Sequence, residues 1–298
     1  MTLEQLRIFV TVADRLHVTR AAELLNLTQS AVSAAIAALE NRHNVQLFHR
    51  VGRRIELTEP GTVFVGEAKA VLARADSAEL VLDELAELNR GSLSVHASQT
   101  IANYWLPPLL YLYRQRYPNI VIGLVIGNTT QVARAVLDGT ANIGFVEGAF
   151  NEAGLEELLL EGDALALVVG RSHPWAKRQG VAAHELRDTE WVLREPGSGT
   201  RSEFEDAITA QGVSLRDLRV VLELPSNEAV QAAVATGAGA TAVSELAIKS
   251  SLAAGILHTL EFAFPARPFR AVWHKERYRT KSVLALLELV RSHAGDHA

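Results

Sequence analysis

The sequence predicts an α/β fold class, in which an N-terminal helix-turn-helix domain and a long helix precede a larger part made of two α/β lobes. Two short helical patterns separated by a tight turn occupy residues 19–40. A helical pattern without proline then runs from residue 61 to residue 89. Beyond it, apolar β-branched runs alternate with helical patterns, which is typical of βαβ units.

Residues 19–40 have the pattern of a helix-turn-helix, whose second helix enters the major groove of DNA. Thr19 suits the cap of the first helix and Thr28 that of the second, because a hydroxyl accepts from free backbone N–H groups. The inward positions recur at helical spacing: Ala21, Ala22 and Leu25, then Val32, Ile36 and Leu39. The expected DNA contacts are short and polar: Thr28, Gln29, Ser30 and Ser33. An ordinary helical hairpin in a core is the alternative.

The next residues have the pattern of a two-stranded wing, with alternation over residues 46–50 and 54–58. Arg50, Arg53 and Arg54 would then face phosphate groups, which position a protein on DNA. Seven arginines against five carboxylates give residues 1–58 a net charge of +2. A solvated hairpin with no DNA contact is the alternative.

Residues Ala21 to Glu40 have the pattern Ala-Ala-x-x-Leu-x-x-Thr-Gln-x-Ala-Val-Ser-x-x-Ile-x-x-Leu-Glu. By this pattern the chain closely resembles the LysR-type transcriptional regulators. Flanking residues also fit: Leu3, Leu6, Phe9, Leu47, Phe48 and Arg50. His43 and Asn44 depart from the family, which usually has an apolar residue and a glycine there. Because asparagine tolerates the left-handed conformation better than most residues, we expect the helix cap to survive.

A long linker helix is predicted over residues 59–89. Thr58, Glu59 and Pro60 supply a hydroxyl cap, an acid and a proline at its first turn. Small and apolar residues recur at intervals of four and three: Phe64, Ala68, Val71, Ala75, Ala78, Leu82 and Leu85. Such a seam predicts a partner helix, and the resemblance implies an antiparallel dimer of linkers. The expected dimerisation residues are Phe64, Val71, Leu82 and Leu85. A helix packed on its own domain is the alternative.

The remainder, residues 90–298, is expected to hold two small lobes with parallel sheets. Strand-like runs lie at residues 93–97, 120–126 and 141–146, then at 164–169, 191–194, 219–224 and 240–243. The resemblance implies an effector-binding domain of type II periplasmic-binding-protein-like architecture. Lobe I is expected over about 90–161 and 268–298, and lobe II over about 162–267. The chain would cross between lobes after Glu147 and near residues 262–269, and a last helix between residues 277 and 293 would close lobe I.

Three polar segments stand where ligands bind in α/β sheets, after strands or at helix N-termini. They are Ser98-Gln99-Thr100, Gly127-Asn128-Thr129 and Gly197-Ser198-Gly199-Thr200, and Ser226-Asn227-Glu228 is a weaker fourth. Hydroxyls and free N–H groups suit a small oxyanion or carboxylate, although each segment alone also fits a plain helix cap. The resemblance implies that they line an effector pocket, so the candidates are Ser98, Thr100, Asn128, Thr129, Ser198 and Thr200.

Glu147 is a further candidate, because it follows the strand-like run that ends at residue 146. A carboxylate there would repel an anion unless it is paired or protonated. Arg201 or a ligand ammonium is the expected partner, and a solvated glutamate at a strand end is the alternative. The strings at residues 98–102 and 127–129 also resemble the family branch that senses inorganic sulfur or carbon-fixation status. This similarity suggests sulfite, sulfate or a phosphorylated metabolite as the effector.

Catalytic and metal-binding patterns are absent from the sequence. Gly197-Ser198-Gly199 lacks the spacing of a hydrolase elbow, there is no phosphate-binding Gly-Lys-Ser/Thr, and the ten histidines are scattered. Zero cysteines exclude disulfides, thiolate zinc sites and thiol-based peroxide sensing. We therefore expect a protein that is not an enzyme and has no metal or cofactor apart from a small anionic effector.

Composition agrees with a small DNA-facing patch on an otherwise acidic regulator. The chain has 298 residues and a net charge of −5, with 48% hydrophobic and 21% charged residues. No run reaches transmembrane length, and the cytoplasm is the expected compartment. The expected partners are double-stranded promoter DNA, further copies of the chain in a dimer and tetramer, and RNA polymerase. The rival class is a cytoplasmic solute-binding protein or enzyme whose helical appendage does not bind DNA.

Overall fold

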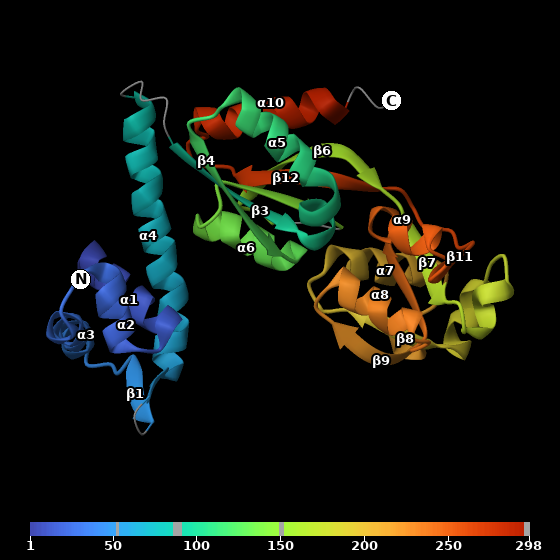
Figure 1. The fold of residues 1–298 in the computed structure, drawn as a ribbon, viewed down its shortest axis with the longest axis horizontal. Helices are drawn as coiled ribbons and strands as arrows, with labels where there is room; N and C mark the ends of the chain where they lie inside the picture. The colour runs from blue at the N-terminus through green and yellow to red at the C-terminus, as the bar shows by residue number, and fades with distance from the viewer. Residues whose placement is uncertain (52–53, 86–90, 149–151, 295–298) are drawn as a thin grey trace. The chain divides into compact units, whose positions relative to one another are not determined.

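The computed structural model describes residues 1–51, 54–85, 91–148 and 152–294, without the side chains of residues 54, 77, 80, 83–85 and 294 (Figure 1). Contacts divide the chain into two compact units. Met1–Leu82 and Asp138–Thr140 form the first, and Asp83–Leu137 and Ala141–Ala298 form the second. The predicted boundary between linker and effector domain at residue 90 stays a prediction, because residues 86–90 lie outside the described part.

The first unit contains a helix-turn-helix, a hairpin and a long helix. Its elements are α1 (Leu3–Arg15), α2 (Val18–Leu25), α3 (Gln29–His43), β1 (Phe48–Val51), β2 (Arg54–Leu57) and α4 (Glu59–Leu85). The chain bends by 107° between α2 and α3, within the range of DNA-binding helix-turn-helix motifs. Strands β1 and β2 pair antiparallel, as a wing requires. In the described residues no single helix has the length and apolarity to cross a membrane, although α2 and α3 together pass that test by composition.

Helix caps explain where these helices begin and end. The Thr28 hydroxyl accepts from the Ala31 N–H at 3.2 Å, so α3 starts where predicted. The prediction of Thr19 as the cap of α2 is wrong, because His17 Nδ1 accepts from the Arg20 N–H at 3.4 Å and α2 begins one residue before Thr19. Asn44 ends α3 in the left-handed conformation, with φ of 50°.

Two buried clusters hold the first unit together. One joins α1, α2 and α3 through Ile8, Val12, Ala21, Ala22, Val32 and Ile36. The other joins α1, α3 and α4 through Leu6, Phe9, Leu39, Leu47 and Ala68. The predicted inward faces of both helices are therefore confirmed, and the opposite face of α3 is exposed.

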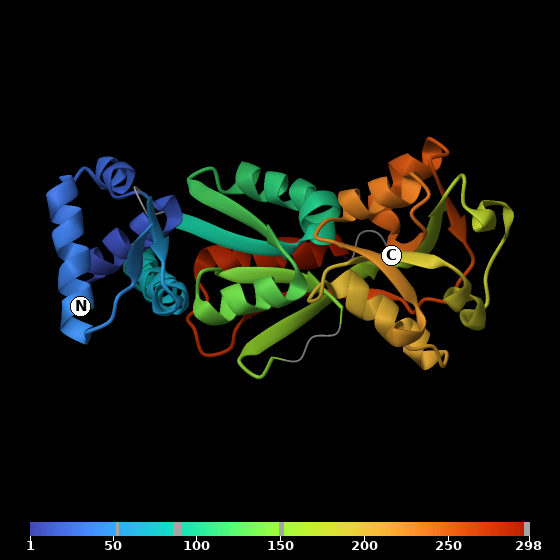
Figure 2. The ribbon, with the colours of Figure 1, turned by 90° about the horizontal axis from the view of Figure 1, so that it is seen from below.

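Lobe I of the second unit is a five-stranded sheet in the order β4-β3-β5-β12-β6. Its strands are β3 (Gly91–Ser98), β4 (Ile120–Gly127), β5 (Ile143–Glu147), β6 (Leu155–Asp163) and β12 (Arg267–His274). Strands β3, β4 and β5 are parallel, whereas β12 is antiparallel to both β5 and β6, which run beside it (Figure 1, Figure 2). The predicted strands of lobe I are therefore parallel, and β12 and β6, which were not predicted, make the sheet mixed.

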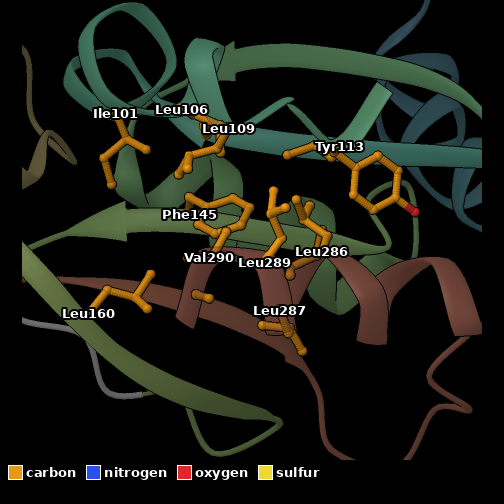
Figure 3. Close-up of a cluster of buried hydrophobic side chains, with 14 of the residues drawn as sticks. Ile101, Leu106, Leu109, Tyr113, Phe145, Leu160, Leu286, Leu287, Leu289 and Val290 are labelled. Atoms are coloured by element: carbon orange, nitrogen blue, oxygen red, sulfur yellow. The ribbon is translucent and has the colours of Figure 1, made fainter. Parts of the chain in front are cut away.

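Helices cover both faces of the lobe I sheet. They are the π-helix η1 (Ile101–Trp105), α5 (Leu106–Arg116), α6 (Thr129–Asp138) and α10 (Lys281–Ala294). Figure 3 shows side chains of α5 and α10 meeting around Phe145. On the other face α6 packs through Val132 and Val136 against Val146 and Val272. The helix predicted between residues 277 and 293 therefore closes lobe I, as expected.

Lobe II is a second five-stranded sheet in the order β11-β7-β10-β8-β9. Its strands are β7 (Leu165–Gly170), β8 (Glu190–Arg194), β9 (Arg219–Leu224), β10 (Ala240–Ser244) and β11 (Leu257–Leu260). Its helices are α7 (Gly199–Ala210), α8 (Asn227–Ala235) and α9 (Glu245–Ala253), with short 3₁₀ turns at Pro174–Lys177, Ala183–Asp188 and Leu215–Asp217. Helix α7 covers one face, and α8 and α9 cover the other. This sheet is also mixed, because β7 is antiparallel to β10 and β11.

The chain passes between the lobes twice. The first crossover lies after Glu147, between the end of β6 at Asp163 and the start of β7 at Leu165. The second lies at residues 261–266, between β11 and β12. Strand β6 pairs with β12 in the lobe I sheet, so the chain stays in lobe I for one more strand after β5.

Candidate effector site and nucleic-acid interface

Buried polar side chains gather where strands and helices of the two lobes meet. The buried ones include Ser98, Thr100, Asn128, Thr129, Glu147, Arg194, Ser198, Thr200, Asn227 and Arg267. The cluster contains all seven predicted effector residues, together with Asn227, which the sequence suggested more weakly. The structure adds two arginines that the sequence gave no reason to select.

Glu147 is the centre of the lobe I side of this site. Its carboxylate accepts from the Ser98 hydroxyl, and its backbone carbonyl accepts from Thr129 Oγ1 at 2.8 Å. Burial raises the pKa of Glu147, and the nearby charge of Arg267 opposes the shift without reversing it. The alternative of a solvated glutamate at a strand end is therefore wrong.

Arg201 is not the partner of Glu147, contrary to the prediction. Its guanidinium binds Glu205 Oε1 at 2.6 Å and Glu223 Oε1 at 2.5 Å. The cation that faces Glu147 is Arg267, at the start of β12. Arg267 Nη2 binds Asp163 Oδ2 at 2.9 Å, and its Nη1 donates to Thr200 Oγ1 at 3.3 Å. It therefore connects the crossover to the N-terminus of α7.

A second arginine, Arg194 at the end of β8, organises the lobe II side. Its Nη1 donates to Asn227 Oδ1 at 2.7 Å, and its Nε donates to Glu195 Oε2 at 2.8 Å. Asn227 Nδ2 donates in turn to Thr100 Oγ1 of lobe I at 3.2 Å. Asn128 Nδ2 of lobe I donates to Glu195 Oε1 at 3.2 Å. The two lobes are thus joined by hydrogen bonds through the predicted residues.

Helix capping distinguishes among the predicted polar segments. Asn128 Oδ1 accepts from the Gln131 N–H at 3.0 Å, so Asn128 is a helix cap in addition to its contact with lobe II. Ser198 precedes α7 and Thr100 precedes η1, and neither makes a side-chain capping hydrogen bond. The plain-cap interpretation therefore fits Asn128 but does not account for Ser198 or Thr100. The N-terminus of α7 has positive electrostatic potential, which suits an anion.

Glycines allow the lobes to approach closely beside this site. A Cβ atom on Gly199 would lie 2.1 Å from the Glu147 carbonyl oxygen. Gly148 has φ of +90°, and a Cβ atom there would lie 2.9 Å from the Cα atom of Gly199. Side chains at these two positions are therefore incompatible with the observed contact between α7 and the end of β5.

The charges of the site nearly cancel. Glu147, Asp163 and Glu195 are carboxyl groups, whereas Arg194 and Arg267 are cations. Burial raises the pKa of Glu147, which favours its uncharged form and so reduces its repulsion of an entering anion.

The candidate DNA-binding residues lie on exposed parts of the first unit. Gln29, Ser30 and Ser33 are exposed on α3 together with the capping residue Thr28. Arg50 is exposed on β1. Arg53 lies outside the described residues, and the side chain of Arg54 is also not described.

The predicted seam of α4 divides into two parts. Phe64 packs against Phe9 at a ring-centroid distance of 5.0 Å, and Ala68 is buried in the same cluster, so this half packs on its own unit. Phe64 is half-buried in this packing, and its role in a dimer interface stays a prediction. Val71 is 42% exposed and Leu82 is 66% exposed, which leaves the second half of the helix open to a partner. The side chain of Leu85 lies outside the description.

Fold and site together define a class of protein: a winged helix-turn-helix domain joined by a helix to a two-lobed α/β domain with a buried polar site between its lobes. The family model "LysR substrate binding domain" matches residues 86–295, and "Bacterial regulatory helix-turn-helix protein, lysR family" matches residues 3–62. The chain belongs to the LysR family. It is accordingly a DNA-binding transcriptional regulator with an effector-binding domain, and not an enzyme.

Relatives and solved structures agree with this assignment. The HTH-type transcriptional regulator YeiE of Escherichia coli K12 is 35% identical over 292 residues, covering 97% of this chain and 96% of the relative. A probable RuBisCO transcriptional regulator of Emiliania huxleyi is 34% identical, covering 86% and 83%.

Among solved structures, full-length CbnR complexed with its target DNA has a TM-score of 0.70 at 24% identity, covering 99% and 100% of the two chains, which shows the fold. The regulatory domain of CcmR from Synechocystis PCC6803, in complex with 2-PG, has a TM-score of 0.62 at 26% identity. That match covers 69% of this chain and 98% of the CcmR chain.

Proposed function

We propose that this regulator binds promoter DNA through α3 and the wing, and that a small anionic effector in the site between the lobes modulates this binding. The observation that carries the proposal is the convergence of Thr100, Ser198 and Thr200 with two buried guanidiniums next to the N-terminus of α7, which no side chain caps. Hydroxyl donors, a helix N-terminus and arginines are the groups that recognise oxyanions.

Sulfite, sulfate and phosphorylated metabolites are the effectors that the chemistry favours. Each presents several acceptor oxygens to the hydroxyl and guanidinium donors of the site, and the raised pKa of Glu147 reduces the opposition of this carboxyl to an anion. The complex of the CcmR regulatory domain with 2-PG supports a small molecule as the ligand of a domain of this fold. Shikimate, which carries a carboxylate, is bound by the effector binding domain of QuiR, a domain of this fold.

Assembly and location follow from the proposed role. Val71 and Leu82, with Leu85, are proposed to form the antiparallel linker interface of a dimer, and the effector domains to join dimers into a tetramer. Because the partner is promoter DNA, we place the protein in the cytoplasm, where RNA polymerase is a further partner.

Thermal denaturation with a panel of anions tests the effector proposal. A ligand that binds only the folded state raises the free energy of unfolding, by about 2.7 kcal/mol at one hundred times its Kd. We therefore expect the Tm to rise with sulfite, sulfate, phosphate or a phosphorylated sugar. Thr100→Ala should abolish the rise, whereas the exposed Thr259→Ala should keep it. If an anion still raises the Tm of Thr100→Ala, the anion binds at another place in the chain. If no anion raises the Tm but an amine does, Glu147 is instead the binding partner of a ligand ammonium group.

A further inference from the structure

The two crossovers between the lobes are joined by one buried ion pair. Asp163 is the last residue of β6 and Arg267 is the first of β12, and the two face each other in the strand register. Their side chains are 3% and 0% exposed, and the guanidinium holds both carboxylate oxygens. A buried, two-pronged pair of this kind fixes geometry, because removing one partner leaves an uncompensated charge in the interior.

Backbone packing also holds β6 and β12 together at the two crossovers. The register between β6 and β12 shifts between Arg267 and Phe269, which is a β-bulge. A Cβ atom on Gly162 would lie 1.8 Å from the Arg267 carbonyl oxygen, so only glycine permits this approach. Ser244, at the end of β10 in lobe II, donates its hydroxyl to Asp163. Asp163 therefore receives contacts from both lobes where the chain crosses between them.

The same guanidinium faces the effector site. Arg267 Nη1 donates to Thr200 Oγ1, and the charge of Arg267 lowers the pKa of Glu147 more than that of Arg194 does, against the larger effect of burial. Three of the five N–H groups of this arginine donate to Asp163 or Thr200. The other two have no acceptor assigned among the described residues, and an anion beside Thr200 supplies one.

On the basis of the function proposed above, we propose that Arg267 binds the anionic effector and that Asp163 is a positioning residue through which the bound anion acts on both crossovers. An anion and Asp163 compete for the charge of one guanidinium. Occupancy of the site therefore weakens the ion pair that fixes the crossovers, and the angle between the lobes responds. This coupling assigns a role to two residues separated by 104 positions in the chain.

The test measures anion affinity and the distance between lobes in the full chain. Because the chain has no cysteine, Gln115→Cys on α5 and Thr209→Cys on α7 give two exposed sites for spin labels, one in each lobe. The anion that raises the wild-type Tm is titrated by calorimetry, and label distances are measured by electron resonance with and without it. The variants are Asp163→Asn, the charge-restoring Asp163→Glu, and Asp217→Asn as a matched control in an exposed ion pair with Arg187.

In Asp163→Asn we expect the anion Kd to fall at least about fivefold, the lower end of typical coupling between sites. A merely structural defect would weaken binding instead. The anion-free distance distribution should broaden, and the anion should no longer shift it. Asp163→Glu should recover part of the wild-type behaviour, and Asp217→Asn should match the wild type throughout.

Unchanged Kd and unchanged distances in Asp163→Asn contradict the proposal, as does weaker binding. If Asp163→Asn does not fold, Ser244→Ala removes one hydrogen bond to Asp163, and the same changes at smaller size are expected. If the wild-type protein binds no anion, the proposed effector class fails, and the anion-free distances still decide whether Asp163 fixes the crossovers.

Discussion

Glu147 shows how burial sets the chemistry of a single residue. Its carboxyl lies at the end of β5, with the Ser98 hydroxyl on one side and the Arg267 charge nearby. Asp163 adds a repulsive charge, whereas Arg194 adds an attractive one. Desolvation is the largest of these effects, so the pKa of Glu147 lies above its ordinary value of 4.5.

Glu147→Gln should therefore change how stability depends on pH. Because the folded-state pKa is raised, the folded chain keeps a proton that the unfolded chain has lost above pH 4.5. The stability that Glu147 contributes is complete below this value and is lost as the pH rises through the folded-state pKa. The free energy of unfolding of the wild type, relative to Glu147→Gln, should fall with rising pH. Urea denaturation over a pH series measures this difference, and parallel curves for the two proteins would contradict it.

At this scale the sequence identified residues with local signals and missed those without them. Ser98, Thr100 and Ser198 stand at strand ends or helix starts, where their hydroxyls are recognisable. Arg267 has no such signal, because the antiparallel pairing of β12 with β6 brings it to the site. Arg201 was selected because it is close to the polar segment in sequence, but its carboxylate partners on α7 and β9 hold it elsewhere.

Among the elements, helices with strong caps and periodicity were predictable, and antiparallel strands were not. Helix α3 begins at the Thr28 cap, and α4 begins after Thr58, whose hydroxyl accepts from the Gly61 N–H at 3.0 Å. Strand β6 contains four acidic residues in nine and lies at a sheet edge, so it lacks the apolar run that marks a buried strand.

The two halves of α4 predict different outcomes for different substitutions. Leu82→Asp places a charge on the exposed half, so it should weaken dimerisation and leave the stability of the first unit unchanged. Phe64→Ala removes a ring that packs on Phe9, so it should cost up to about 3 kcal/mol of stability. Light scattering and thermal denaturation measure the two effects. Leu24→Asp, exposed on α2, is the control for an added surface charge.

An unchanged oligomer in Leu82→Asp would remove the linker interface from the account. If Phe64→Ala instead dissociates the oligomer without lowering the thermal stability, the interface lies on the half of α4 that packs on its own unit.

At the scale of the whole molecule, regulation requires that the effector distinguish two arrangements of the chain. A ligand shifts such an equilibrium only by the difference in its affinity for the two states. The hydrogen bonds that Asn128 and Asn227 make across the lobes are contacts that a change in the lobe angle would alter, and the Asp163–Arg267 pair lies where the chain crosses between the lobes. The order of domains and the division into two lobes were predictable from the change in hydrophobic rhythm. The pairing of β6 with β12 beside the crossovers was not, because it joins residues about one hundred positions apart.

The central claim is sequence-specific DNA binding by α3, and selection of duplexes from a random pool by the full chain tests it most directly. We predict enrichment of one motif with two-fold symmetry. Gln29→Ala or Ser33→Ala should relax the base choice by about 1–3 kcal/mol per contacted base pair at an unchanged salt dependence. Arg50→Ala should weaken binding to all sequences and reduce the salt slope by about one. Selection without enrichment, or equal weakening on every sequence by Gln29→Ala and Ser33→Ala, would contradict the claim.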